Sequence, residues 1–275
     1  MPKAVFFLIL ATLLSACSPS EAPKAKETLS READSTPLAS PDRTVITIGA
    51  DPWCPHNCMV GGQQEGYMID ITREVFEASG YEVEYLNVSW ARALQMTREG
   101  LLDAVVSAFT SDAPDFVFPD EPQGRSHIAM YTPAGSQWLY QGLESLTDQT
   151  LLAINGYSYS TELDNYIRSH TDDPARVWVI SGPSPLNRAI YLLDQHRADV
   201  YPEDVYVMTW ALKDHKGIRP PRNAGLLQKT DTYVAFSPEH ERSGQLAALL
   251  SEGTARLRES GRIREIMATY GLPED

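Results

Sequence analysis

The apolar side chains of this chain repeat with two different periods, and the periods predict strands and helices in alternation. Residues 66–80 place apolar side chains at the spacing of a helix, and Gly80 is the expected stop. Residues 81–88 instead alternate apolar and polar side chains, as a half-buried strand does. In chain order the first half gives a strand at 44–50, a helix at 66–80, a strand at 81–88, a helix at 89–100 with the cap Ser89, and a buried strand at 103–109. This order is typical of a parallel α/β sheet, which binds ligands at the carboxyl ends of its strands.

The same alternation begins again in the second half, which predicts a second α/β unit. Its expected strands are 150–156, 176–181 and 198–201, and its expected helices are 160–170, 184–197 and 203–215. Ser184 and Pro185 favour the start of the second of these helices, as a cap and a first-turn residue. A loop at 216–225 follows, then a strand at 230–237 and helices at 239–260 and 262–271. Two such units predict two lobes, with the first ligand loops after Ala50, Val88 and Ser107.

The first 43 residues differ in composition from the rest and predict an exported lipoprotein. The apolar run at 4–14 is too short to span a bilayer as a helix, but it has the length of a signal-peptide core. It ends in Leu-Ser-Ala-Cys, which resembles the lipobox of bacterial lipoproteins, where the Cys becomes the first mature residue and carries the lipid. We therefore expect a lipoprotein signal peptide at 1–16, lipidated Cys17, and a flexible tether at 17–43 that reaches about 28 Å. The alternative is an ordinary signal peptide cut near Ala16.

The charge of the chain argues against nucleic acid as a partner. The formal net charge is −14, and it becomes −15 without the signal peptide, because residues 1–16 contain Lys3 and no acid. A surface of that sign repels phosphate backbones and offers no polybasic patch to a membrane. The predicted signal peptide gives the expected location, which is periplasmic or extracytoplasmic with the lipid at Cys17 as the membrane attachment. The expected state is a monomer.

Cys54 and Cys58, in the stretch DPWCPHNCMV at 51–60, are expected to form a disulfide. Export places them in an oxidising compartment, and they are the two thiols left once Cys17 is lipidated. A metal site is an alternative that would add His56, but a structural zinc normally has four ligands and no second Cys/His cluster is visible. A thioredoxin-type redox pair is a further alternative, although its cysteines are separated by two residues and these by three. So small a loop contributes only about 2 kcal/mol of stability, and its use would be local shape.

Three stretches of the chain together resemble one known family. They are GYMIDI at 66–71, EGLLDAVVSAFT at 99–110 and ARLRESGRIREIMATYGL at 255–272. In their order and spacing the chain resembles the bacterial extracellular solute-binding proteins of family 3, which deliver amino acids and similar solutes to ABC importers. The resemblance implies a type II periplasmic-binding-protein fold, in which two mixed α/β lobes on a two-segment hinge close around a ligand. It places lobe 1 at 44–132 plus 237–275, lobe 2 at 137–232, and the hinge segments at 133–136 and 233–236.

The resemblance also implies which residues contact the ligand. In lobe 1 they follow the ends of the first three strands: Trp53, Trp90, Ser107 and Thr110. In lobe 2 they follow strands of the second unit: Tyr157, Ser158 and Asp204. Tyr157 and Ser158 come after Gly156 at a turn from strand to helix, where free N–H groups receive an anionic group. Asp204 matches the acid that holds a ligand ammonium.

The chain departs from the family at the residue that binds the carboxylate of an amino acid. The family carries an Arg shortly after the third strand as a bidentate clamp, but no Lys or Arg occurs here between Arg98 and Arg125. Arg92 would substitute if its helix start points into the cleft, although a solvated helix face is the commoner place for it. The cleft is therefore expected to suit a cationic or neutral solute. Aromatic rings would add about 0.5 to 2 kcal/mol each toward a cation, unless they only pack the lobes: Trp53, Trp90 and Tyr157.

The sequence carries no complete enzyme motif, and we predict a binding protein with no cofactor and no metal. The stretch GYSYS at 156–160 lacks the last Gly of the serine-hydrolase elbow, and no His pair has the H-E-x-x-H spacing. The enzyme alternative is a dehydratase on the same fold, with Glu203 and Asp204 as acid and base. A sensory lipoprotein that reports to a membrane receptor is a third class. The predicted function is capture of a small polar solute for an ABC-type importer.

Overall fold

The computed structural model describes residues 44–182, 184–215 and 217–273. The predicted signal peptide at 1–16, the lipidated Cys17 and the tether at 17–43 lie outside the described residues. Within the described part the chain forms eight strands, seven α-helices and one short 3-10 helix.

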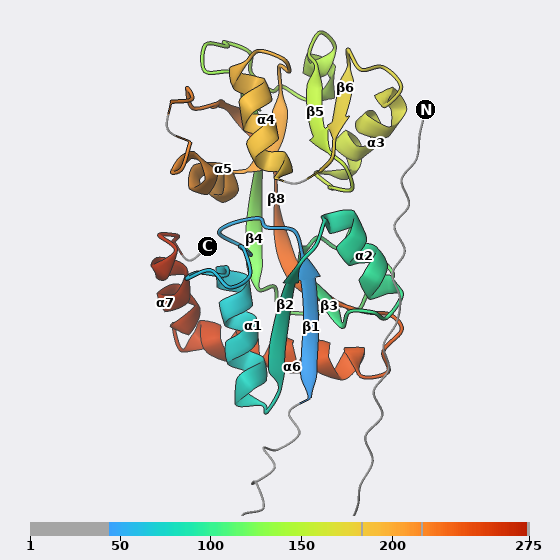
Figure 1. The fold of residues 1–275 in the computed structure, drawn as a ribbon, viewed down its shortest axis with the longest axis vertical. Helices are drawn as coiled ribbons and strands as arrows, with labels where there is room; N and C mark the ends of the chain where they lie inside the picture. Colours follow the sequence, from blue (N-terminus) through green and yellow to red (C-terminus); the bar gives the residue numbers. More distant parts are fainter. Residues whose placement is uncertain (1–43, 183, 216, 274–275) are drawn as a thin grey trace, which may run out of the picture. The chain divides into compact units, whose positions relative to one another are not determined.

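β1 (Val45–Ala50) is the centre of the parallel part of the sheet. It pairs in parallel with β2 (Glu82–Asn87) on one side and with β3 (Ala104–Ala108) on the other. The connecting helices are α1 (Tyr67–Ala78) and α2 (Trp90–Arg98), which confirms the predicted alternation (Figure 1). Ser89 precedes α2 as expected, but its side chain makes no capping hydrogen bond.

The C-terminal helices α6 (Ser243–Glu259) and α7 (Arg262–Thr269) return to this first unit and pack against α1. α1 buries the apolar face that the spacing predicted, including Met68, Ile71 and Val75. The approach is close at one point, because a Cβ atom on Gly253 would lie 2.3 Å from Val75 Cγ1. Position 253 therefore requires glycine for this packing.

β4 (Gly124–Thr132) and β8 (Arg222–Phe236) form a long antiparallel pair that joins the two α/β units. β8 also pairs with β3, and β4 with β7 (Tyr201–Asp204), so the strand order is β2-β1-β3-β8-β4-β7. Both strands run from one group of elements to the other in Figure 1. The sequence predicted no strand at 124–132, and its loop at 216–225 is wrong from Arg222 onward. Neither strand alternates regularly between buried and exposed positions, and each is defined by its partner's hydrogen bonds.

The second unit repeats the strand and helix order that the sequence predicted. β5 (Leu151–Ile154) and β6 (Val177–Ile180) pair in parallel, and Val200 bridges to Leu151. The remaining elements are a 3-10 helix (Leu143–Leu146), α3 (Thr161–His170), α4 (Pro185–Asp194) and α5 (Val205–Leu212). In this unit the expected cap Ser184 makes no capping bond, whereas Ser160 and Asp204 do.

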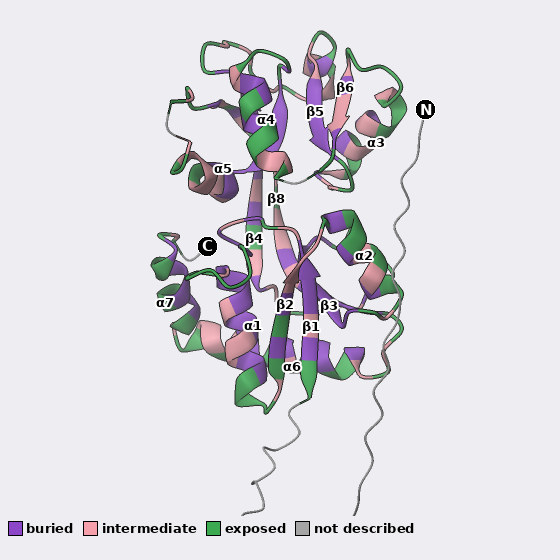
Figure 2. Ribbon diagram, in the orientation of Figure 1, coloured by how far each residue is buried: buried purple, intermediate pink, exposed green. Residues whose placement is uncertain are grey.

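The buried apolar side chains form three clusters. Figure 2 shows that buried residues occur in the elements of both units. One cluster belongs to β1, β2, β3, α1, α6 and α7, and another to β5, β6 and α4. The third surrounds β5 and α3 and takes in Trp53 and Phe109 from the first unit. Tyr157 packs against all three clusters, so this residue marks the place where the two units meet.

Candidate functional site

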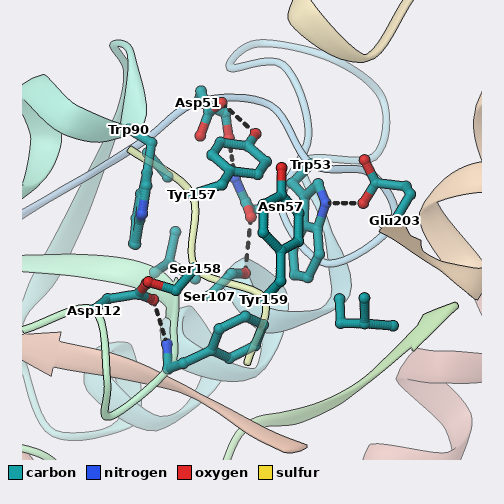
Figure 3. Close-up of a pocket in the computed structure, with 14 residues that line it drawn as sticks. Asp51, Trp53, Asn57, Trp90, Ser107, Asp112, Tyr157, Ser158, Tyr159 and Glu203 are labelled. Atoms are coloured by element: carbon teal, nitrogen blue, oxygen red, sulfur yellow. Dashed lines mark hydrogen bonds between the residues drawn. The ribbon is translucent and has the colours of Figure 1, made fainter. Parts of the chain in front are cut away.

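A pocket lies where the loops after β1, β3 and β5 meet the start of α2 and the end of β7 (Figure 3). Its volume is about 40 Å³, which is room for about three water molecules. The lining residues come from both units: Ala50, Asp51, Trp53, Asn57, Trp90, Val106, Ser107, Phe109, Asp112, Ile128, Tyr157, Ser158, Tyr159 and Glu203. The carboxyl ends of β1, β3 and β5 thus meet at one site, as the strand order predicted.

Most of the residues that the sequence singled out lie in this pocket. Five of them line it: Trp53, Trp90, Ser107, Tyr157 and Ser158. Thr110 and Arg92 are exposed side chains outside the lining, and Arg92 lies on the solvated face of α2. Asp204 also lies outside the lining, and the acid that reaches the pocket is its neighbour Glu203.

The loop after β1 is closed by a disulfide between Cys54 and Cys58, as predicted. Because the disulfide uses both sulfur atoms, the metal alternative for this pair falls away. Backbone hydrogen bonds hold the loop on both sides, from Trp53 N to Asn57 O at 2.7 Å and from Cys58 N to Glu65 O at 2.7 Å. The Asn57 amide also donates to Asp51 O at 2.7 Å. The loop is therefore fixed in the conformation that presents Trp53.

Trp53 projects from this loop toward the second unit. Its ring stacks on His56 with 4.4 Å between ring centroids and meets the edge of Phe109 at 6.3 Å. Its Nε1 donates to Glu203 Oε1 at 2.8 Å, a bond that joins the two units. A second bond joins the units where the Tyr157 hydroxyl donates to Asp51 Oδ2 at 2.5 Å.

Ser107 lies at a bulge in β3 and adopts a left-handed backbone conformation, with φ of 67°. The pairing with β8 shifts between Val106 and Ala108, so Ser107 is the extra residue of the bulge. Its hydroxyl donates to Asn57 Oδ1 at 2.8 Å and thereby links β3 to the cysteine loop. Such conformations are costly for residues other than glycine and gather at functional sites, where they turn a side chain toward a ligand.

Three carboxyl groups line the pocket and no Lys, Arg or His does: Asp51, Asp112 and Glu203. Burial raises the pKa of Asp51 to about 6 against the opposing hydrogen bond from Tyr157. Burial raises the pKa of Glu203 to about 7, although Tyr201 and Trp53 donate to it. Burial likewise raises the pKa of Asp112 to about 7. The pocket therefore holds acids that lack a nearby positive charge.

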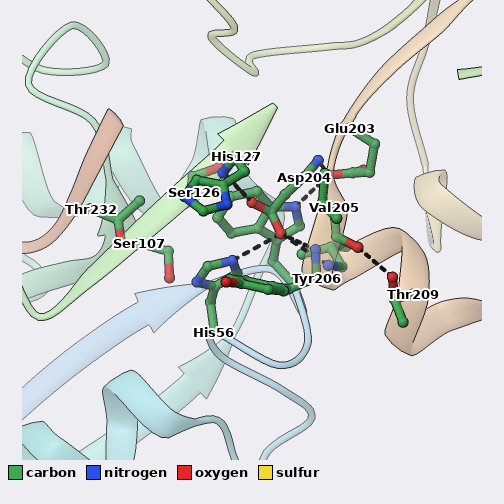
Figure 4. A network of polar contacts seen from close by, with 12 residues as sticks. His56, Ser107, Ser126, His127, Glu203, Asp204, Val205, Tyr206, Thr209 and Thr232 are labelled. Atoms are coloured by element: carbon green, nitrogen blue, oxygen red, sulfur yellow. Dashed lines mark hydrogen bonds and ion pairs between the residues drawn. The ribbon is translucent and has the colours of Figure 1, made fainter. Parts of the chain in front are cut away.

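Asp204 belongs to a buried network behind the pocket (Figure 4). Its Oδ2 accepts from Ser126 Oγ at 2.8 Å and from His127 N at 2.7 Å. Its Oδ1 caps α5 by accepting from Tyr206 N at 2.7 Å and Val207 N at 3.0 Å, and it lies 3.2 Å from His56 Nε2. Burial alone would raise the pKa of Asp204, but the His56 ring and these donors outweigh burial and hold the pKa below its usual value.

Several lining residues were missed by sequence reasoning: Asp51, Asn57, Phe109, Asp112 and Tyr159. For Asp112 a signal was present, because the segment after the third strand, where the resemblance expected an Arg, contains acids and no base. For Asn57 and Tyr159 no signal existed, since polar loop residues of this kind are common on any surface.

Two α/β units joined by a pair of long strands, with a pocket between them, define a periplasmic-binding-protein type of fold. The chain matches the family described as bacterial extracellular solute-binding proteins, family 3, over residues 46–273, and it belongs to that family. This membership places the protein outside the cytoplasm. No curated protein matches the chain.

Solved structures with this fold include proteins with different roles. A histidine kinase sensor domain with similarity to periplasmic binding proteins is 20% identical, with a TM-score of 0.68 over 83% of this chain and 96% of that one. A putative L-cystine ABC transporter protein from Listeria monocytogenes is 14% identical, with a TM-score of 0.67 over 82% and 95%. An ancestral amino-acid-binding protein, described as a precursor of cyclohexadienyl dehydratase, is 14% identical, with a TM-score of 0.62 over 82% and 94%. At these identities the likeness establishes the fold alone.

Proposed function

We propose that the protein captures a small polar solute between two lobes and presents it to an ABC-type importer. The observation that carries this proposal is a pocket lined from both units and bridged by two bonds, Trp53 to Glu203 and Tyr157 to Asp51. Because its volume of about 40 Å³ is too small for an amino-acid-sized solute, entry requires the lobes to separate.

The paired strands β4 and β8 support a hinge between the lobes in this proposal. They are the two long strands shared by both units; β4 leads into the predicted segment 133–136, and β8 contains 233–236 as its last residues. When two lobes close, a hinge of a few residues at the ends of strands or helices takes up the change in backbone φ and ψ angles. We therefore keep lobe 1 at 44–132 plus 237–275 and lobe 2 at 137–232 as the moving bodies.

Attachment through a lipid on Cys17 completes the proposal. It rests on the lipobox-like residues before Cys17 and on the polar composition of residues 18–43. Among the described residues, no helix has the length and apolar character needed to cross a membrane. The tether would hold the binding lobes within about 28 Å of the lipid.

Binding is favoured over acid/base catalysis by the way Glu203 is held. Its Oε1 accepts from Trp53 Nε1 at 2.8 Å and from Asp204 N at 2.8 Å, and its Oε2 accepts from Tyr201 at 2.5 Å. Asp204, the other acid considered for catalysis, lies outside the pocket lining. Turnover of a cyclic hydroxy acid that is lost on Glu203→Gln would reverse this preference. Neighbouring genes for a permease and an ATPase would favour transport over a sensory role.

A bound solute is expected to stabilise the protein measurably. Native mass spectrometry of freshly purified protein identifies any solute that is retained, and unfolding, dialysis and refolding then remove it. Adding that solute back at about 100 times its Kd is expected to raise the free energy of unfolding by about 2.7 kcal/mol. If the untreated and the refolded protein carry no solute and no screened solute raises the Tm, the proposed function is rejected.

Removal of the disulfide is expected to weaken solute binding more than stability. Cys54→Ser with Cys58→Ser frees the loop that orients Trp53, whereas so small a closed loop contributes only about 2 kcal/mol to the free energy of unfolding. Calorimetric titration and urea unfolding measure the two losses. Met59→Ser is the control, because that side chain is 58% exposed and lies outside the closed loop. Normal binding by the double variant, or two free thiols in the intact protein, contradicts this account of the loop.

A further inference from the structure

The charges around the pocket are of one sign. The three carboxyl groups of Asp51, Asp112 and Glu203 line it without any basic side chain. The Arg residues nearest in sequence to the segment after β3 are engaged elsewhere, since Arg98 pairs with Asp115 at 2.7 Å and Arg125 with Asp231 at 2.9 Å. A ligand carboxylate would therefore meet three acids and no counter-charge, which disfavours any solute that carries one.

One of the three acids differs from the others in its hydrogen bonding. Asp51 accepts from Tyr157, and both oxygens of Glu203 accept from side chains, Oε1 from Trp53 and Oε2 from Tyr201. Asp112 is held by its Oδ2, which accepts from Phe109 N at 2.7 Å, while its Oδ1 is buried without a hydrogen-bond partner. The Ser158 hydroxyl interacts with this carboxyl group and lowers the Asp112 pKa, but it carries no charge.

A buried carboxylate oxygen without a partner is costly, and a bound cation would supply the missing partner. The pocket also offers aromatic rings, which attract cations through their faces: Trp53, Trp90, Phe109, Tyr157 and Tyr159. Figure 3 labels all of these except Phe109. The orphaned oxygen and the rings are independent features, and both favour positive charge.

We propose that the pocket takes a small organic cation without a carboxylate group, such as an alkyl amine or a guanidine, and that Asp112 Oδ1 anchors its positive centre. This inference rests on the proposed function, because it names the class of solute for the same pocket. Asp112 lies in the segment where the family resemblance expected a carboxylate-binding Arg. An acid at this end of the pocket favours a positively charged ligand group in place of a carboxylate.

Proton linkage gives this assignment a second signature. The raised pKa values of Asp51, Asp112 and Glu203 mean that part of the acid population is neutral near pH 6 to 7. Asp164 faces Asp112, Tyr157 faces Asp51, and Glu203 is faced by Trp53, Tyr201 and Asp204. No positively charged group is among these neighbours, so a cation drives the acids into their ionised form. Binding then releases protons and weakens as the pH falls from 8 to 6.

The test compares amino acids with the amines that differ from them only by the lost carboxylate. The pairs are L-arginine with agmatine, L-lysine with cadaverine, and L-phenylalanine with phenethylamine, each titrated calorimetrically into the full chain at pH 8. At least one amine is expected to bind, and to bind about ten- to a hundredfold more tightly than its amino acid. Asp112→Asn keeps an acceptor for Phe109 N and is expected to weaken the binding of that amine by a similar factor. Asp120→Asn makes the same change at an exposed acid outside the pocket and is expected to leave binding unchanged.

Several outcomes would overturn the assignment. If amino acids bind more tightly than their amines, solute binding stands and the cation class is wrong. If an amine binds equally to wild-type protein and to Asp112→Asn, Asp112 is not the anchor. If none of the amines binds at about 1 mM while native mass spectrometry finds an anionic solute, the cation class is wrong and the proposed function survives. If no solute of any class binds, both fail. The paired titrations use wild-type protein, so they remain decisive even if Asp112→Asn does not fold.

Discussion

Asp204→Ala is expected to lower the free energy of unfolding by about 3 to 5 kcal/mol. The substitution removes the cap of α5, the acceptor for Ser126 and His127, and the partner of the buried His56 ring. The side chains of Ser126 and His56 are fully buried, so the groups that contact Asp204 lose that partner where water does not replace it. Urea unfolding monitored by circular dichroism measures the loss.

Two further variants separate the causes of this loss. Asp204→Asn keeps the helix cap when its oxygen takes the place of Oδ1, but its amide N–H groups then lie against His127 N, so we expect an intermediate loss. Asp214→Asn is the control at an exposed acid that follows the same helix, and its stability is expected to stay within about 0.5 kcal/mol of wild type. Equal stability of Asp204→Ala and wild type would show that this network does not hold the second unit in place.

The ligand-free protein is expected to become more stable as the pH falls from 8 to about 5.5, by about 2 to 4 kcal/mol. Burial raises the pKa of Asp51 to about 6 and those of Asp112 and Glu203 to about 7. At a pH between the pKa values of the unfolded state and these raised pKa values, the native state holds more protons than the unfolded state. The stabilisation is therefore complete below the unfolded values and is lost as the pH rises through about 6 to 7.

The opposite behaviour is expected at more acidic pH. The pKa values of Asp204 and Asp103 are held below the usual value against burial, by His56 for Asp204 and by Thr47 and Arg242 for Asp103. The stabilisation that these two carboxylates contribute is present at a pH above their pKa in the unfolded state. It is lost as the pH falls through their lowered pKa in the folded state. Equilibrium unfolding at intervals from pH 3 to 8 is the measurement, and Glu203→Gln should reduce the slope between pH 5.5 and 8. A continuous rise in stability from pH 5.5 to 8 would refute the assignment of raised pKa values to the pocket.

The pattern of side chains was enough to predict most of the secondary structure. Helical spacing found α1, and alternation found β2, because these elements bury one face against their own unit. The stretches at 66–71, 99–110 and 255–272 together were enough for the family. The disulfide followed from the compartment and from the number of cysteines, which depend on the sequence alone.

β4 and much of β8 could not be predicted in this way. Their residues pair with strands about 70 to 110 positions away, and the hydrogen bonds between backbones impose the extended conformation whatever the local pattern. The cap at Ser184 could not be predicted either, since this residue has a left-handed backbone and its side chain makes no capping bond.

The identity of the acid that faces the pocket was also beyond the sequence. Glu203 and Asp204 are adjacent, and successive side chains of a strand point to opposite faces, so a strand brings only one of them to the site. The register of β7 against β4 directs Glu203 to Trp53 and Asp204 to Ser126, His56 and the start of α5. Nothing in the local sequence fixes that register.

The sequence by itself thus determined the family, the alternating elements, the closed cysteine loop and the absence of a basic residue after the third strand, because these depend on local composition and spacing. Only the tertiary structure decided that Asp51, Asp112 and Glu203 share one pocket and that the free carboxylate oxygen belongs to Asp112. Those facts depend on contacts between segments 50 to 150 residues apart, such as Ser107 with Asn57 and Trp53 with Glu203. The charge that the pocket prefers is therefore a property of the folded chain.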